Sequence, residues 1–181
     1  MRSTLASFAS LGLLIALCTY SDAARADDAA PKASLGGEAV LEVPLGNFSA
    51  ATPLGLGALG VFHYRVIPKL DITGRTGLLV FIPKSGGVTL VDWPVLGGVA
   101  FRPLAESAAT TDGFDVSAEL GPNFLFATQG GGSRTSVATR VTAGYSWPSI
   151  TVRGGLVVND LGYAGDSFAL TASVGTTFAS L

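Results

Sequence analysis

Hydrophobic and polar residues alternate almost without exception along two consecutive segments of the chain, residues 114–126 and 134–147. In the first segment Leu120, for example, shares a face with other apolar residues, while Glu119 lies on the opposite face. Successive side chains of a β-strand point to opposite faces, so each segment predicts a strand with one apolar and one polar face. The glycine-rich break at 129–133 predicts that the two strands form a hairpin.

The length of these two segments and the nature of their polar face indicate a membrane protein. A strand of a soluble protein has about five or six residues, whereas a tilted strand needs about 9–11 residues to cross a bilayer. The polar faces carry Asp115, Glu119 and Arg140 beside the small residues Gly121 and Gly144. A packed soluble core could not accommodate such a face, but the wet, narrow interior of a barrel could. The hairpin therefore predicts a transmembrane β-barrel.

The same alternation recurs in six further segments, which brings the number of predicted strands to eight. The predicted strands cover residues 36–45, 54–66, 70–82, 88–102, 114–126, 134–147, 150–159 and 167–178. The predicted fold class is all-β, an eight-stranded antiparallel up-and-down transmembrane β-barrel. Its even number of strands places both chain ends on the same side of the membrane, which we expect to be the periplasmic side.

The connections between the strands follow this topology with one exception. We expect polar loops near 47–53, 83–87, 128–133 and 160–166 to face outward. The connections at 67–69 and 147–149 are very short, as outer-membrane barrels prefer on the periplasmic side. The connection at 103–113 is longer, and its role is not explained by the topology.

The parity of the strands points a set of charged residues into the barrel. These residues are Glu42, Arg65, Asp71, Arg75, Asp92, Glu119, Arg140 and Arg153. Four acids and four bases could neutralise one another in pairs. A slip of one residue would turn them toward lipid, where an arginine costs about 2–4 kcal/mol at the midplane. An eight-stranded barrel is just wide enough for its side chains to fill it, so we expect a structural network rather than an ion path.

Large aromatic residues gather near the ends of the predicted strands. They are Tyr64, Trp93, Tyr145, Trp147 and Phe178. A ligand-binding surface is one interpretation of this group. We favour the other, in which they form interfacial aromatic girdles at the two surfaces of the membrane.

Composition agrees with a barrel that follows a leader peptide. The 181 residues suffice for one domain; only 13% of them are charged, 48% are hydrophobic and 24 are glycine. Residues 1–26 have the charged start, apolar core and Ala-x-Ala cleavage site of a signal peptide. We expect residues 27–35 to form a disordered periplasmic tail and residues 36–181 to form the barrel. The single cysteine, Cys18, belongs to the leader, and a net charge of −2 offers no basic surface for nucleic acid.

A catalytic function would depend on His63, the only histidine of the chain. A hydrolytic triad would need it near a nucleophilic serine and a carboxylate, for which Ser117, Ser136 and Glu119 are inward candidates. No nucleophile-elbow, metalloprotease or phosphate-loop motif and no cluster of metal ligands occurs. We therefore expect no catalytic residues, no metal and no cofactor, and the sequence identifies no ligand-binding residue.

The leader, the eight amphipathic strands and the last strand that ends near Phe178 resemble small bacterial outer-membrane β-barrel proteins of the OmpA/OmpX type. The resemblance covers residues 36–178 and lies in the pattern rather than in a specific motif. It implies a place in the outer membrane of a Gram-negative cell and contact with its lipids, including lipopolysaccharide. It also implies insertion by the barrel-assembly machinery. We expect a monomer.

Three functions are compatible with this fold. The first is a non-enzymatic role in envelope integrity or surface interaction, the second is a narrow porin-like pore for small molecules, and the third is a lipid-modifying enzyme. The His-x-Ser-Asn pattern of lipid-A deacylase barrels is absent, because the chain reads His63-Tyr64-Arg65. A soluble barrel of the lipocalin type is disfavoured, since the charged face has too many glycines and too few charges for a soluble exterior. We favour the first function.

Overall fold

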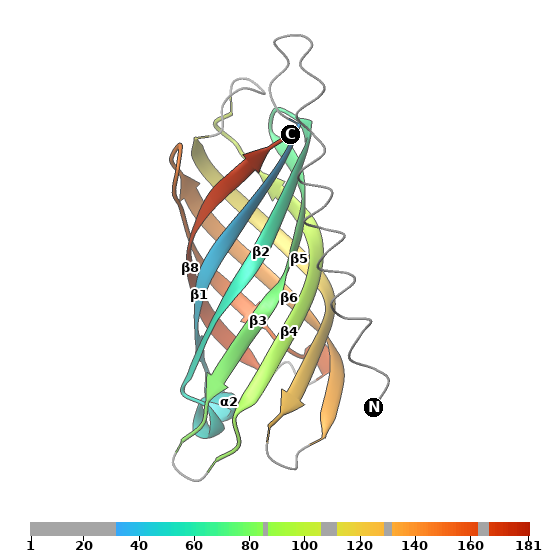
Figure 1. Ribbon diagram of the computed structural model, residues 1–181, viewed down its shortest axis with the longest axis vertical. Helices are drawn as coiled ribbons and strands as arrows, with labels where there is room; N and C mark the ends of the chain where they lie inside the picture. Colours follow the sequence, from blue (N-terminus) through green and yellow to red (C-terminus); the bar gives the residue numbers. More distant parts are fainter. Residues whose placement is uncertain (1–31, 85–86, 106–111, 129–131, 163–166) are drawn as a thin grey trace.

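A closed ring of eight strands makes up the barrel, and one short helix lies between the first two strands (Figure 1). The computed structural model describes residues 32–84, 87–105, 112–128, 132–162 and 167–181. The predicted leader, residues 1–26, lies outside the described residues. The elements are β1 (Ala33–Pro44), α2 (Gly46–Ala51), β2 (Leu54–Ile67), β3 (Leu70–Ile82), β4 (Leu90–Phe101), β5 (Gly113–Ala127), β6 (Ser133–Ser146), β7 (Thr151–Val158) and β8 (Phe168–Ser180).

Each strand pairs antiparallel with its neighbours in sequence, and β1 closes the ring by pairing with β8. At the seam the main-chain nitrogen of Ala33 donates to the oxygen of Leu181 over 3.0 Å, and the nitrogen of Leu181 donates back over 2.8 Å. The predicted fold class is therefore confirmed. We call the end of the barrel where β1 begins and β8 finishes the terminal end, and the opposite end, where α2 lies, the far end (Figure 1).

Two predictions about the first strand and the loop after it are wrong. The strand begins at Ala33 and not at residue 36, because Ala33 pairs with Tyr64 of β2 and with the end of the chain. Residues 33–35 thus belong to the barrel and not to a disordered tail. The segment predicted as a polar loop, 47–53, instead begins with a helix.

Helix α2 is one turn and a half long and folds over the far end of the barrel. Its first turn is held by the Ser49 hydroxyl, which donates to the carbonyl oxygen of Gly46 over 2.7 Å. The ring of Phe48 packs on the ring of Phe81 with centroids 5.1 Å apart. Partial burial of this aromatic side chain against the hydrophobic cluster, rather than a side-chain cap, therefore explains why the segment is helical.

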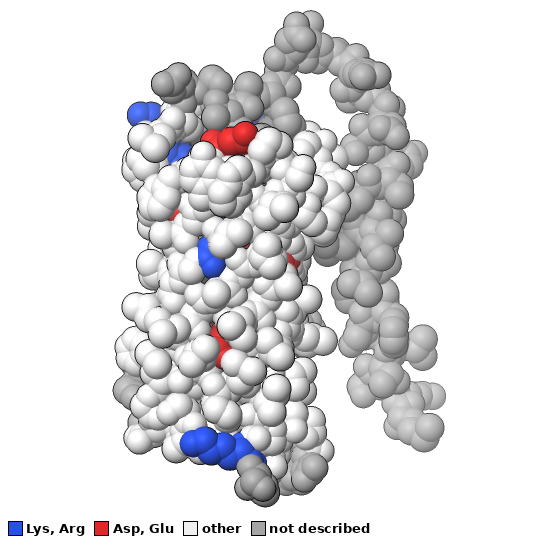
Figure 2. Space-filling model, turned by 90° about the vertical axis from the view of Figure 1, so that its left-hand side faces the viewer, with Lys and Arg blue, Asp and Glu red and all other residues white. Residues whose placement is uncertain are grey.

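Apolar side chains point outward from the barrel wall and charged side chains point inward, which is the reverse of a soluble protein. The outward Leu78 and Leu120 are 55% and 54% exposed, whereas the inward Glu119 and Arg140 are each 2% exposed. Few charged side chains are visible along the wall in Figure 2. A continuous apolar exterior around a charged interior suits a barrel surrounded by lipid. No helix among the described residues combines the length and the apolar content needed to span a bilayer.

The interior changes character along the barrel. Near the far end it contains a hydrophobic cluster of Val40, Leu59, Leu79 and Phe81, against which Phe48 and Leu90 pack. Other inward side chains are polar or charged, from Glu42, Asp92 and Asn123 near the far end to Asp71 near the terminal end. Apolar packing therefore fills only part of the far end, beside polar side chains.

Candidate functional site

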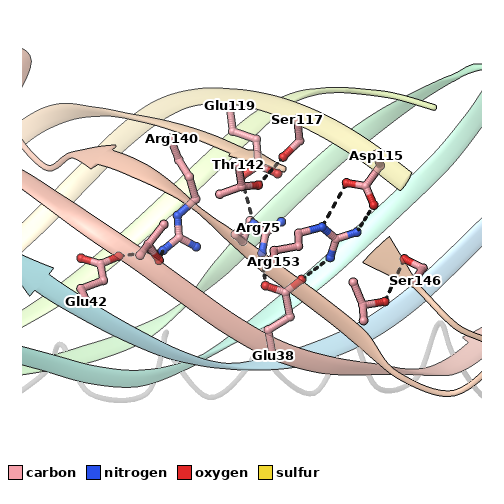
Figure 3. A network of polar contacts seen from close by, with 12 residues as sticks. Glu38, Glu42, Arg75, Asp115, Ser117, Glu119, Arg140, Thr142, Ser146 and Arg153 are labelled. Carbon is pink, nitrogen blue, oxygen red and sulfur yellow. Dashed lines mark hydrogen bonds and ion pairs between the residues drawn. The ribbon is translucent and has the colours of Figure 1, made fainter. Parts of the chain in front are cut away.

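Ion pairs between strands that are not adjacent in the ring fill the middle of the barrel (Figure 3). Glu38 of β1 accepts hydrogen bonds from two arginines, Arg75 of β3 and Arg153 of β7, the second over 2.5 Å. Arg75 also donates from its Nε to Glu119 over 2.9 Å. Arg153 forms a two-pronged pair with Asp115, with distances of 3.1 and 3.2 Å. Two arginines and three carboxylates thus form one continuous chain, which we call the central network.

A second group of polar contacts lies beside the central network, nearer the far end. Arg140 of β6 donates from Nη2 to Glu42 of β1 over 2.7 Å and to the Thr171 hydroxyl over 2.8 Å. The side-chain nitrogen of Asn159 donates to the other oxygen of Glu42 over 3.4 Å. Since the side chains of both Arg140 and Glu42 are buried, this pair links β1 and β6 across the lumen.

Glycines make room for the long side chains of the central network. A Cβ atom at Gly144 would lie 2.3 Å from Cγ of Arg153 and 2.6 Å from the main-chain oxygen of Val152. A Cβ atom at Gly175 would lie 2.5 Å from Cγ of Glu38. Any larger residue at these two positions would push the charged side chains away from their partners.

A third cluster lies at the terminal end, around Asp71 of β3. Arg102, which follows β4, approaches Oδ2 of Asp71 to 2.6 Å, and Arg65 of β2 approaches Oδ1 to 3.3 Å. The Nδ1 atom of His63 lies 3.8 Å from Oδ2. One carboxylate therefore faces two arginines and the histidine, and we call these four residues the Asp71 cluster.

The eight charged residues predicted to point into the barrel belong, with one exception, to these three groups. Arg75, Glu119 and Arg153 belong to the central network, Glu42 and Arg140 form the second group, and Arg65 and Asp71 belong to the Asp71 cluster. Asp92 is different: it is 1% exposed, yet within the described part of the chain it forms no ion pair. In the strand register it lies beside Leu79 and Leu125, and its side chain is close to Asn123 and to Glu42 and Arg140 of the second group.

The charged set predicted to face the lumen left out two central acids, Glu38 and Asp115. The predicted balance of four acids and four bases is therefore wrong: among the described residues, six buried acids of the strands face inward with five arginines, apart from Asp160 in the connection after β7. The acids are Glu38, Glu42, Asp71, Asp92, Asp115 and Glu119, and the arginines are Arg65, Arg75, Arg102, Arg140 and Arg153. The parity of the strands already placed Glu38 and Asp115 on the polar face, so the signal for both was present in the alternation.

The side chains considered for catalysis are engaged in different parts of the barrel. The Ser117 hydroxyl hydrogen-bonds that of Thr142 over 2.7 Å, and the Ser136 hydroxyl donates to the main-chain oxygen of Asn159 over 2.9 Å. Glu119 accepts from Arg75, and His63 lies beside Asp71. The described residues contain no group of three His, Cys, Asp or Glu side chains arranged to hold a metal ion.

The aromatic residues singled out from the sequence lie on the outside, near both ends of the barrel. The rings of Tyr145 and Trp147 are in tilted contact, with centroids 4.7 Å apart, at the terminal end of β6. Trp93 contacts Phe124 near the far end and donates from Nε1 to the Thr76 hydroxyl over 3.0 Å. Tyr64 and Phe178 are 42% and 69% exposed, close to the terminal ends of their strands.

Solved structures of small outer-membrane proteins share this fold. Ail, the attachment invasion locus protein of Yersinia pestis, superposes with a TM-score of 0.52 at 14% identity, over 83% of this chain and all of Ail. Its structure in a phospholipid bilayer nanodisc gives 0.51 at 12% identity, over 80% of this chain and 99% of Ail. Neisserial surface protein A gives 0.52 at 16% identity, over 81% of this chain and 96% of the other. The chain has the fold of an outer-membrane β-barrel.

No family model matches the sequence, and no curated protein matches it either.

Proposed function

We propose that the protein is a non-enzymatic barrel of the bacterial outer membrane that supports the integrity of the envelope. The observation that carries this proposal is a filled interior inside an apolar wall. Ion pairs occupy the middle of the barrel, and hydrophobic side chains occupy its far end. Such a barrel is suited to a structural role in the bilayer, and it lacks the wide aqueous channel that a general pore needs.

The outer surface indicates how the barrel lies in the membrane. We infer that the aromatic residues Tyr64, Tyr145, Trp147 and Phe178 mark one membrane interface and that Trp93 marks the other. The wall between them contacts lipid, and the proposed partners are lipopolysaccharide and, during insertion, the barrel-assembly machinery. The barrel acts as a monomer. The far end faces the outside of the cell, and the terminal end faces the periplasm.

A role in surface interaction is the second candidate. The name of Ail connects that protein with attachment and invasion, and the present chain has the same fold. The connections at the far end of this barrel are short, however, and α2 is packed down onto Phe81. They offer a small surface for a partner, which is why we place envelope integrity first.

A deletion strain tests the proposal. The native protein should fractionate with the outer membrane and migrate differently in gels before and after boiling. Loss of the gene should raise the sensitivity of the cells to detergents and leave the lipid A composition, measured by mass spectrometry, unchanged. A changed lipid A acylation pattern would instead indicate a lipid-modifying enzyme. Recovery of the protein as a soluble periplasmic monomer would contradict the barrel itself.

A further inference from the structure

The two ends of the barrel interior are closed to different degrees. At the far end Phe48 packs on Phe81, and the connection after β7 turns inward, so that Asn159 and Asp160 are 4% and 7% exposed. At the terminal end there is a cavity of about 200 Å³. A water molecule occupies roughly 30 Å³ in the liquid, so this cavity has room for several waters or for one compact ligand.

Basic side chains outnumber acidic ones around this cavity. Its lining contains the bases Lys32, Arg65, Arg102 and Arg153 and the acids Glu38 and Asp71. Arg153 and Glu38 belong to the central network, where Asp115 and Glu119 add further negative charge. Nearer the mouth, by contrast, the carboxylate of Asp71 faces both Arg102 and Arg65. Among the described lining residues, basic side chains therefore exceed acidic ones at the mouth, in a chain whose net charge is −2.

His63 supplies a polar atom in the same place. Its Nδ1 atom is buried and has no hydrogen-bond partner, although the ring lines the cavity. A buried polar group without a partner is unfavourable, and such groups in native structures call for an explanation. Nδ1 itself lies 3.8 Å from Oδ2 of Asp71 and is closed to the cavity, but an oxyanion there could accept a hydrogen bond from an N–H on the accessible edge of the ring and pair with the nearby guanidinium groups.

We propose that the cavity at the terminal end is a binding site for a compact oxyanion, a phosphate group or a small dicarboxylate, held by Arg65, Arg102 and His63. Guanidinium groups bind both chemistries through paired hydrogen bonds. The site goes beyond the envelope role proposed above. In the proposed topology it opens to the periplasm, so its ligand would come from that side.

Fluorescence of Trp147 measures binding directly. Trp147 lies in the lining of the cavity, and Trp93, the only other tryptophan of the chain, lies near the far end. In a Trp93→Phe background the folded barrel in detergent is titrated with inorganic phosphate and, separately, with succinate, at constant ionic strength set with potassium chloride. We expect a saturable change in Trp147 emission. A response to phosphate alone assigns a phosphate group, a response to succinate alone assigns a dicarboxylate, and a response to both assigns a less selective oxyanion site.

Matched variants separate the site from the general charge of the barrel. Arg102→Gln should weaken binding about tenfold or more, as expected for the loss of a charge-assisted hydrogen bond. Arg134→Gln removes the same charge from a half-exposed arginine outside the cavity, paired with Asp160, and should leave the affinity unchanged. His63→Phe keeps a ring of similar size without its donor and should also weaken binding.

Gel migration before and after boiling shows that each variant is folded. If Arg102→Gln fails to fold, the comparison of His63→Phe with Arg134→Gln gives the same information. A change in emission that does not saturate, or an equal effect of Arg102→Gln and Arg134→Gln, would overturn the proposal, as would the absence of any response to both anions.

Discussion

Arg153 shows at the scale of one residue why the interior is a network and not a set of isolated pairs. It is 5% exposed and contacts both Glu38 and Asp115. Two buried charges repay the loss of their hydration only when their geometry is good and their remaining hydrogen bonds are satisfied. Removal of one member therefore leaves its partners buried and without compensation.

The substitution Arg153→Gln tests this argument. We expect the free energy of unfolding, measured by urea titration in lipid vesicles, to fall by about 3–5 kcal/mol, which is typical of breaking a buried ion pair. Arg134→Gln makes the same change at a half-exposed arginine that pairs with Asp160 and should cost at most about 1 kcal/mol. Similar losses for the two variants would mean that the interior is well hydrated.

The lumen is tightly packed, so added side-chain volume should destabilise the barrel just as the loss of a charge should. Gly144→Ala would bring a methyl group against both Arg153 and the main chain, so we expect a loss of about 1–3 kcal/mol in the same unfolding experiment. Gly154→Ala is the matched control on the next strand, where the nearest atom lies 3.8 Å from the new Cβ, and it should change stability by about 0.5 kcal/mol or less. A neutral Gly144→Ala would show that Arg153 has room to move.

At the scale of the strand, the outward face of β5 must be compatible with hydrocarbon. Leu120→Arg places a charge near the middle of β5, where we expect a cost of about 2–4 kcal/mol and a lower folding yield in vesicles. Leu104→Arg changes the same residue type in the turn after β4, where the side chain is 73% exposed, and should fold normally. Equal folding yields would contradict the assignment of the lipid-facing side.

The sequence predicted the features that depend on neighbouring residues and not those that depend on residues far apart along the chain. Alternation is local, so it placed β3 at residues 70–82 as found and predicted both faces of β5 and β6. The alternation did not predict helix α2, because six residues without a side-chain cap carry no periodic signal and their helical form depends on the contact with Phe81. The alternation also did not predict which charged residues pair with each other. Glu38 and Arg153 are 115 residues apart, and only the closed ring brings them together.

At the scale of the whole molecule, the filled interior predicts electrical behaviour. Purified protein in planar bilayers should show no stable porin-sized conductance, because the central network and the hydrophobic cluster leave no continuous wide channel. Single-channel recording of the refolded barrel checks this, with boiled protein as the blank. Reproducible large steps would favour the pore among the functions considered from the sequence.

The pairing of β1 with β8 also has a kinetic consequence. The residues that neutralise one another are far apart along the chain: 98 positions separate Glu42 from Arg140. Until the first and last strands meet, these charges face each other across an open sheet, and exposure of each to hydrocarbon is unfavourable. Closure of such a long loop is slow compared with hairpin formation. The chain should therefore enter the bilayer with its ends already joined or held together by another protein, so that insertion and closure occur as one event.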